Sequence, residues 1–195
     1  MNEGRIAGVD YGSNLAGTTS ISYENGGNIF VLQSYKGQSA DEWLKQVINK
    51  ECIQHIFIDA PLSLPNGYFG IGQEFFFRKC DRELKAMSPM FLGGLTARAM
   101  QINFHFNSMQ VQCTEVYPRG FIKSEEKFIP WYNKKDKNSI SMLVDRLSEI
   151  LPYSIETNIN SYHQLDSLIC LYIGYKYSQG KATNFGDEAE GFIWI

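Results

Sequence analysis

Three strand-like segments near the N-terminus constrain the fold more than any other feature of the chain. Residues 5–10 are apolar and end in an acid, residues 17–23 are rich in Thr, Ser and Ile, and residues 29–35 are again strand-like. The last two flank the turn Glu24-Asn25-Gly26-Gly27, and Asn-Gly is a strong signal for a tight hairpin. Consecutive strands joined by hairpins are therefore expected over the first part of the chain.

The rest of the chain alternates between helix-like and strand-like segments. Strands are expected at residues 55–58 and 111–117, separated by a helical insertion at residues 62–108. Beyond a helix that Ser39 caps, the segments expected to be helical are residues 73–86, 96–106, 139–150 and 161–177. The apolar tail at 192–195 is expected to pack down. This order predicts an α/β fold in one domain, residues 1–195, with helices on both faces of a mixed sheet.

Composition narrows the class of protein. The 195 residues suit one domain, and 44% hydrophobic residues can fill a core. A net charge of −3 argues against a protein that coats nucleic acid through bulk positive charge, but it allows a local basic patch. The sequence shows no membrane span and no signal-peptide pattern, so a cytoplasmic protein is expected. No zinc site or disulfide framework is expected from the scattered Cys52, Cys80, Cys113 and Cys170.

Acidic residues fall at positions where two strands end. Asp10 ends the first strand and Asp59 ends the fourth, while Glu115 lies within the fifth. In a mixed sheet the first and fourth strands can be neighbours, so Asp10 and Asp59 are expected to meet at one end. Clustered carboxylates repel one another, and a hard divalent cation such as Mg²⁺ or Mn²⁺ removes that repulsion.

The last long helix carries a fourth acid in an apolar setting. Asp166 lies among Leu165, Leu168 and Ile169, where a carboxylate needs a partner or a metal. His163 precedes Asp166 by three positions and so shares its helix face. Each of these residues also has an ordinary explanation, as a turn former, a loop cap, an edge-strand glutamate or an ion-pair partner. Their order along the chain favours a shared site.

At these residues the chain resembles the DUF429 family of predicted nucleases in the ribonuclease H-like superfamily. His163-x-x-Asp166 also resembles the last-helix motif of RuvC-like Holliday-junction resolvases, which often carry Glu where Asp59 stands. The matching segments are Gly8-Val9-Asp10-Tyr11-Gly12, Ile58-Asp59-Ala60-Pro61-Leu62, Arg78-Lys79-Cys80-Asp81-Arg82-Glu83-Leu84, Thr114-Glu115-Val116-Tyr117-Pro118, His163-Gln164-Leu165-Asp166-Ser167-Leu168 and Glu190-Gly191-Phe192-Ile193-Trp194-Ile195.

The resemblance implies a five-stranded mixed sheet of order 3-2-1-4-5, with strand 2 antiparallel, and a metal-dependent nuclease. In that hypothesis Asp10 bridges two Mg²⁺ or Mn²⁺ ions, and Asp59 and Asp166 each hold one side. His163 orients or deprotonates the attacking water, and Glu115 supports the ligand set. The substrate is nucleic acid, DNA or RNA, and the oligomeric state is left open, a dimer included.

The insertion is expected to lie over the active face. Its arginines Arg78, Arg82 and Arg98 are candidates for phosphate contacts, and its aromatic residues for stacking on bases. The alternative is that the aromatic residues are core and the basic residues a solvated face. A second basic region, expected to be solvated surface rather than a clamp, comprises Lys123, Lys127, Lys134, Lys135 and Lys137.

Two other classes of function stay open at the level of sequence. Asp10-x-Gly12 followed by Gly17-Thr18-Thr19 resembles the first phosphate loop of actin, Hsp70 and sugar kinases, although those proteins use two such domains and 195 residues supply one. The third class is a non-catalytic binding module that keeps the fold, with which the net charge of −3 is compatible.

Overall fold

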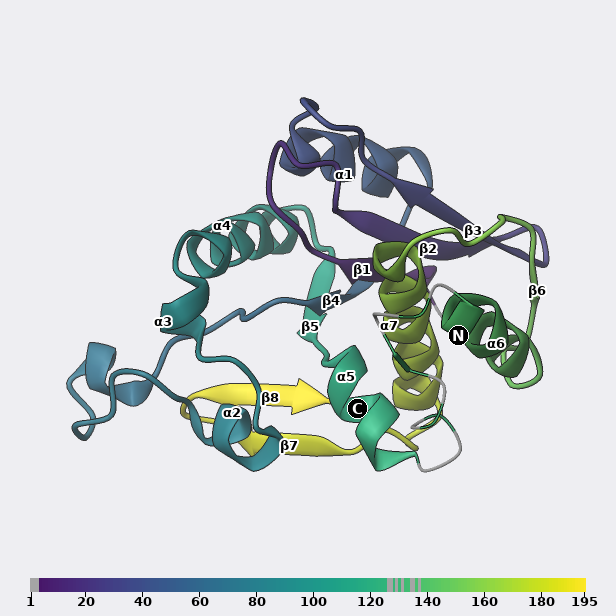
Figure 1. Ribbon diagram of the computed structural model, residues 1–195. Helices are drawn as coiled ribbons and strands as arrows, with labels where there is room; N and C mark the ends of the chain where they lie inside the picture. Colours follow the sequence, from purple (N-terminus) through teal and green to yellow (C-terminus); the bar gives the residue numbers. More distant parts are fainter. Residues whose placement is uncertain (1–3, 126–127, 129, 131, 134–135, 137) are drawn as a thin grey trace.

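The computed structural model describes residues 4–125, 128, 130, 132–133, 136 and 138–195. Within these residues the chain forms a six-stranded mixed sheet of order β5-β4-β1-β2-β3-β6 and a separate two-stranded sheet (Figure 1). The strands of the main sheet are β1 Ile6–Asp10, β2 Ser20–Asn25, β3 Asn28–Gln33, β4 His55–Asp59, β5 Gln112–Glu115 and β6 Ser154–Ile155. The smaller sheet pairs β7 Asn184–Asp187 with β8 Gly191–Trp194. The α/β class and the mixed sheet are thus confirmed.

The five expected strands lie in the order β3-β2-β1-β4-β5, and β2 runs antiparallel to both of its neighbours. The strand count differs from the expectation, because β6 adds a short parallel strand beside β3. The apolar tail also pairs as β8 with β7, where the sequence predicted only that it packs down. The β2–β3 turn is confirmed: Gly26 and Gly27 both have positive φ, as a two-residue hairpin loop of this hand requires.

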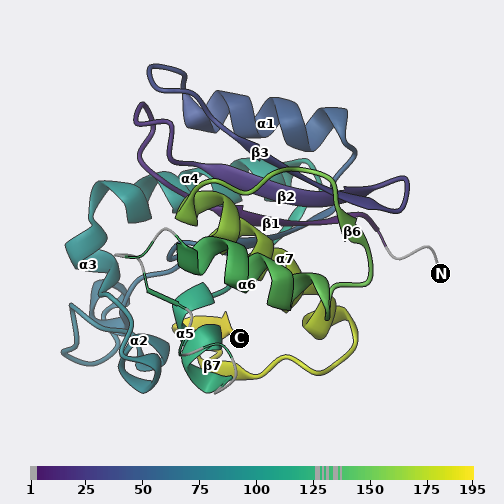
Figure 2. The same ribbon diagram turned by 45° about the vertical axis from the view of Figure 1, so that its right-hand side comes forward.

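Helices cover both faces of the main sheet (Figure 2). On one face α1 Ala40–Lys50 and α4 Gly94–Ser108 pack their apolar sides on β1 and β4, with Leu44, Ile102 and Phe106 fully buried there. On the other face lie α5 Pro118–Ser124, α6 Asn138–Ser148 and α7 Tyr162–Ser178. None of the helices in the described part of the chain has the length and hydrophobicity of a membrane span.

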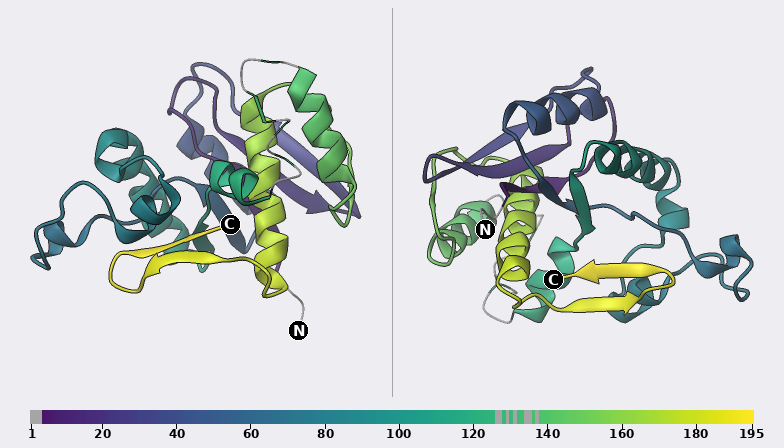
Figure 3. Two further views of the ribbon diagram at one scale, coloured as in Figure 1. Left: turned by 60° about the horizontal axis from the view of Figure 1, so that its bottom comes forward. Right: turned by 180° about the vertical axis from the view of Figure 1, so that it is seen from behind.

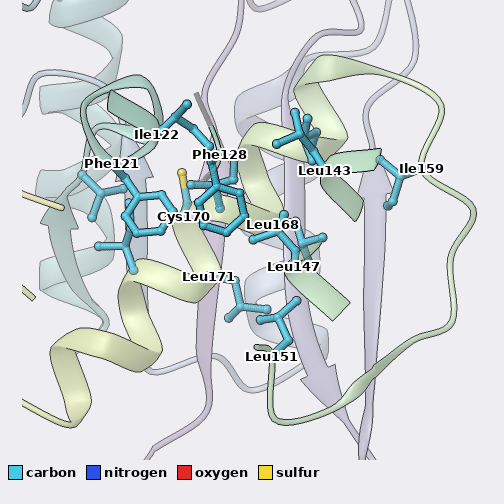
Figure 4. Packing of buried hydrophobic residues seen from close by; sticks show 14 of the residues in the cluster. Phe121, Ile122, Phe128, Leu143, Leu147, Leu151, Ile159, Leu168, Cys170 and Leu171 are labelled. Atoms are coloured by element: carbon cyan, nitrogen blue, oxygen red, sulfur yellow. The ribbon is translucent and has the colours of Figure 1, made fainter. Parts of the chain in front are cut away.

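The α7 side of the sheet holds the larger apolar cluster. Figure 4 shows Phe121 of α5 and Leu143 and Leu147 of α6 packed around Leu168 and Leu171 of α7. At 25–30 cal/mol per Å² of buried apolar surface, each fully buried Leu stabilises the fold by roughly 1.5–3 kcal/mol. The cluster therefore fixes where α7 lies on the sheet.

Close approach of α7 to the sheet depends on glycine in β1. A Cβ built on Gly8 would lie 2.3 Å from the Ser167 carbonyl oxygen and 2.1 Å from the Leu171 amide nitrogen. Both atoms belong to helix backbone and cannot rotate away, so only glycine fits here. Gly8 thereby brings the helix within reach of the strand's carboxyl end.

The insertion is less regular than its sequence predicted. It contains the 3-10 turn η1 Asn66–Phe69 and the helices α2 Lys79–Leu84, α3 Pro89–Leu92 and α4. The expected helix at 73–86 is therefore wrong over residues 73–78. There the Glu74 carboxylate accepts hydrogen bonds from the amides of Phe76 and Phe77, which holds a turn instead. Figure 3 shows the first part of the insertion, which contains η1, extending away from the main sheet.

Candidate active site

Asp10 and Asp59 are direct neighbours at the carboxyl ends of two parallel strands. The register pairs Asp10 of β1 with Asp59 of β4, and the residues two before them, Gly8 and Phe57, are paired likewise. Because side chains alternate along a strand, paired residues of parallel strands leave the sheet on the same face. Gly8 and Phe57 both contact α7, so the two carboxylates also project toward the α7 side.

Helix α7 brings a histidine and a third carboxylate over this pair. The Ser161 hydroxyl accepts a hydrogen bond from the Gln164 amide, and the Gln164 side chain accepts one from the Ser161 amide. This capping box starts the helix so that His163 and Asp166 lie in its first turns. His163 Nδ1 lies 2.6 Å from Asp10 Oδ2. Since a carboxylate only accepts, Nδ1 carries the proton that it donates to Asp10.

Asp166 is buried at 4% exposure, as a site residue in an apolar helix would be. The Tyr132 hydroxyl donates to Asp166 Oδ1 at 2.9 Å. Burial raises the pKa of Tyr132, and the negative charges of Asp166, Asp59 and Asp10 raise it further. Burial and the same three carboxylates also hold the pKa of the Cys170 thiol well above its usual range. The charges of all three acids therefore act on two separate side chains, Tyr132 and Cys170.

A cavity of about 610 Å³ opens beside these acids. Asp59 and Asp166 contribute carboxylates to its wall, and Arg119 and Lys123 of α5 contribute cations. The remaining lining residues are Met87, Leu92, Tyr117, Ile122, Tyr132 and Asn133. Its size is in the range typical of small-molecule and cofactor sites.

Glu115 has a different environment from the other three acids. The register pairs it with Ile58 and not with Asp59, so its side chain leaves the opposite face of the sheet. Both carboxylate oxygens accept from Arg78, Nη1 and Nη2 each at 2.7 Å, and the Leu62 amide donates to Oε2 at 2.9 Å. Glu115 therefore anchors the insertion to β5, and the structure does not bring it into the group formed by Asp10, Asp59 and Asp166.

Arg78 was expected to contact phosphate, but its guanidinium is 1% exposed and bonded to protein acids. Besides Glu115, it donates to Asp81 from Nε at 3.1 Å and from Nη2 at 2.7 Å. Burial lowers the pKa of Arg78, but the hydrogen bonds and charges of Glu115 and Asp81 raise it by more, so the guanidinium stays charged. This arginine is enclosed in the protein.

The other two candidate arginines are also paired with acids. Arg82 forms an ion pair with Glu74 within the insertion. Arg98 of α4 donates to Asp41 of α1 at 2.6 Å and to the Gly12 carbonyl at 3.1 Å. Neither side chain lines the cavity beside Asp59.

Three of the aromatic residues at the start of the insertion are exposed, in contrast to the buried Phe106 at its end. Tyr68, Phe75 and Phe76 are 46%, 44% and 54% exposed, and Tyr68 and Phe75 pack edge to face on one another. The structure does not bring them to the cavity wall. In the second basic region Lys123 does line the cavity, while Lys127, Lys134, Lys135 and Lys137 lie outside the described residues.

Sequence reasoning missed Arg119 and Tyr132. Arg119 directly follows the segment Thr114-Glu115-Val116-Tyr117-Pro118, so its position four residues after Glu115 was a usable signal. Tyr132 lies in a stretch with no period, and no sequence pattern indicates that it contacts Asp166.

The residues of the expected metal site have the right donor chemistry for a hard divalent cation. Asp10, Asp59 and Asp166 supply carboxylate oxygens, the donors that Mg²⁺ and Mn²⁺ prefer. As these side chains lie, no three His, Cys, Asp or Glu groups among the described residues are close enough together to hold a metal ion. Joint ligation of one cation by Asp10, Asp59 and Asp166 therefore requires that these carboxylates move closer together.

In the turn that resembles a phosphate loop, two backbone amides already donate hydrogen bonds to side chains of the protein. The Gly12 amide donates to the Thr19 hydroxyl at 3.1 Å, and the Ser13 amide donates to the Thr18 hydroxyl at 3.2 Å. Backbone amides that already have protein acceptors are not available to cradle a phosphate. The geometry of this turn gives that alternative no support.

Comparison of the chain with family models, with curated proteins and with solved structures finds no match.

Proposed function

We propose that this chain is a nuclease that hydrolyses phosphodiester bonds and depends on a divalent cation, Mg²⁺ or Mn²⁺. The observation that carries the proposal is the register pair Asp10–Asp59, with His163 bonded to Asp10 and Asp166 beside them. The ribonuclease H-like resemblance and the order of the five strands agree with it.

The closeness of two carboxylates explains why the proposed site needs a cation. Asp10 and Asp59 are adjacent in register and on the same face, so their negative charges raise each other's energy. Asp10, Asp59 and Asp166 would hold the cation. When bound, the cation supplies the positive charge that lowers the pKa of a coordinated water and offsets charge developing on the phosphate.

His163 is the candidate base. With its Nδ1 proton donated to Asp10, the ring has its lone pair on Nε2. In the proposed step, a water oxygen forms a bond to phosphorus while a P–O ester bond breaks. Nε2 takes the water proton, and the leaving oxygen acquires a proton from solvent. Asp10 holds the ring in place and stabilises the imidazolium that forms.

Cleavage of labelled oligonucleotides tests this function. Wild-type protein is incubated with fluorescent single-stranded and hairpin DNA and RNA in Mg²⁺, in Mn²⁺ and in EDTA. We expect cleavage that requires the cation and falls by roughly 100-fold or more in Asp10→Asn, since that variant loses both a ligand and the support of His163.

Asp145→Asn is the matched control, because Asp145 is an exposed acid of α6. It should cleave like the wild type, and thermal unfolding of all three proteins should show that they are folded. Absence of cation-dependent cleavage by the wild type, or equal cleavage by Asp10→Asn, would contradict the proposed function.

A further inference from the structure

The basic residues considered as phosphate contacts differ in whether they already form an ion pair with an acidic side chain of the protein. Arg78, Arg82 and Arg98 are each paired with an aspartate or glutamate. Arg119 and Lys123 are exposed, and within the described residues neither has a hydrogen bond or ion pair to another side chain. A cation that is already neutralised must break its pair to bind an anion, whereas an unpaired one does not. Only Arg119 and Lys123 of these five line the cavity beside Asp59 and Asp166.

Helix α5 presents these two cations together. Arg119 and Lys123 are four residues apart, so they lie on one face of the helix, with Ile122 between them. Ile122 is 3% exposed and packs into the apolar cluster around α7, which fixes the face that α5 turns to the cavity. The cations are thus held on the cavity wall by the core beneath them.

The cavity combines three kinds of surface. Asp59 and Asp166 form an acidic part, Arg119 and Lys123 a basic part, and Met87 and Leu92 contribute apolar side chains. An oligonucleotide offers matching chemistry: a scissile phosphate that needs a cation beside carboxylates, a second phosphate one nucleotide away, and a flat base with an apolar face. A free inorganic phosphate matches only the basic part.

We infer that the cavity takes one unpaired nucleotide of a single strand, with a flanking phosphate held by Arg119 and Lys123. A base in a duplex is stacked and cannot enter a cavity of about 610 Å³ unless it is flipped out, which costs a few kcal/mol. The net charge of −3 also argues against binding of a duplex backbone through bulk positive charge. Because it names the substrate of the proposed hydrolysis, this assignment rests on the proposed function.

Fluorescence anisotropy tests the assignment without cleavage. The probes are fluorescein-labelled single-stranded DNA and RNA oligonucleotides and a hairpin duplex, titrated in EDTA at several salt concentrations. The double variant Arg119→Ala/Lys123→Ala is compared with Lys36→Ala/Lys181→Ala, which removes two exposed lysines that are not on the cavity wall.

We expect the wild type to bind a single strand more tightly than the hairpin. The cavity variant should lose roughly 10-fold in affinity, and the slope of log K against log salt should fall by about 0.7, the value for one lost phosphate contact on a single strand. The control variant should bind like the wild type. Equal binding by the two variants, preference for the hairpin, or no binding by the wild type would overturn the assignment.

The same oligonucleotides, incubated with Mg²⁺, separate this assignment from the proposed function. Binding that depends on Arg119 and Lys123 without cleavage keeps the site and removes the hydrolysis. Cleavage that is unchanged in Arg119→Ala/Lys123→Ala keeps the hydrolysis and removes the site.

Discussion

Two groups of acids lie on opposite faces at the same end of the sheet, and they have different kinds of partner. In the enclosed group, Glu115 and Asp81 share the buried guanidinium of Arg78. In the cavity group, Asp10 accepts a hydrogen bond from the imidazole of His163, and Asp166 accepts one from the hydroxyl of Tyr132. The first group is thus held by ion pairs to one buried arginine, whereas the second group accepts hydrogen bonds from an imidazole and a phenol beside a cavity.

The difference teaches that an acid at a strand end does not reveal its role. Asp59 and Glu115 both end strands of the same sheet, one in β4 and one in β5. Register decides between them, because Asp59 is paired with Asp10 while Glu115 is paired with Ile58. One face of the sheet then holds a candidate active site and the other holds a structural ion pair.

The largest effect should come from breaking the enclosed group. Arg78→Met removes the guanidinium and leaves Glu115 and Asp81 buried without their cation, so the free energy of unfolding should fall by roughly 3–5 kcal/mol. Urea denaturation followed by fluorescence measures this loss.

Arg146→Met is the matched control, because Arg146 forms an exposed ion pair with Glu149 on α6. That variant should change the free energy of unfolding by about 0–1 kcal/mol. If both variants cost the same, the Arg78 group is not the structural anchor described above.

A second effect concerns a half-buried histidine. His55 of β4 contacts the Thr114 hydroxyl at 2.8 Å and stacks on Phe57, and burial lowers its pKa to about 4. Between pH 6.5 and 4 the unfolded chain therefore binds a proton that the folded chain does not, so stability contributed by neutral His55 is present above pH 6.5 and is lost as pH falls toward 4.

The measurement is the urea midpoint at several pH values for wild type and His55→Gln. In the wild type the urea midpoint should fall between pH 6.5 and 4, in part because of His55. That part of the fall should be absent in His55→Gln. It should be retained in His105→Gln, the control, which alters a histidine of α4. An identical decline in wild type and His55→Gln would show that burial does not hold this histidine neutral, in contrast to the charged Arg78.

The smallest effect should come from the cavity group. Tyr132→Phe removes the hydroxyl that donates to Asp166, which should lower the free energy of unfolding by about 1 kcal/mol, the net value of one hydrogen bond. Urea denaturation again reports the change. A loss as large as that of Arg78→Met would mean that Asp166 is held as tightly as the enclosed acids, and the contrast between the groups would disappear.

Much of the architecture follows from local sequence patterns. The two-glycine turn after Asn25 fixes the β2–β3 hairpin, and the Ser161–Gln164 capping box fixes the start of α7. The segment at 73–78 was assigned wrongly because Glu74 accepts hydrogen bonds from its own following amides, a local competition that helical periodicity does not reveal. The strand β6 was missed because two residues carry no alternation to detect.

The candidate site was predictable in part. Asp10, Asp59, His163 and Asp166 stand at positions that strand ends and helix spacing indicate. The pairing of Glu115 with Arg78 was not predicted, because a contact between residues 37 positions apart depends on tertiary structure. Arg119 was missed for the same reason. It is a candidate phosphate contact because it lines the cavity and has no acid partner within the described residues, and both properties depend on tertiary structure.

Binding of Mn²⁺ tests the central claim most directly, because the account needs Asp10, Asp59 and Asp166 to hold a divalent cation together. Isothermal titration calorimetry of wild type, Asp10→Asn, Asp59→Asn and the control Asp145→Asn with Mn²⁺ alone measures it without a substrate. The account predicts saturable binding by wild type and Asp145→Asn that is lost in the other two variants. No binding by the wild type at millimolar Mn²⁺, or equal binding by all four proteins, would contradict it.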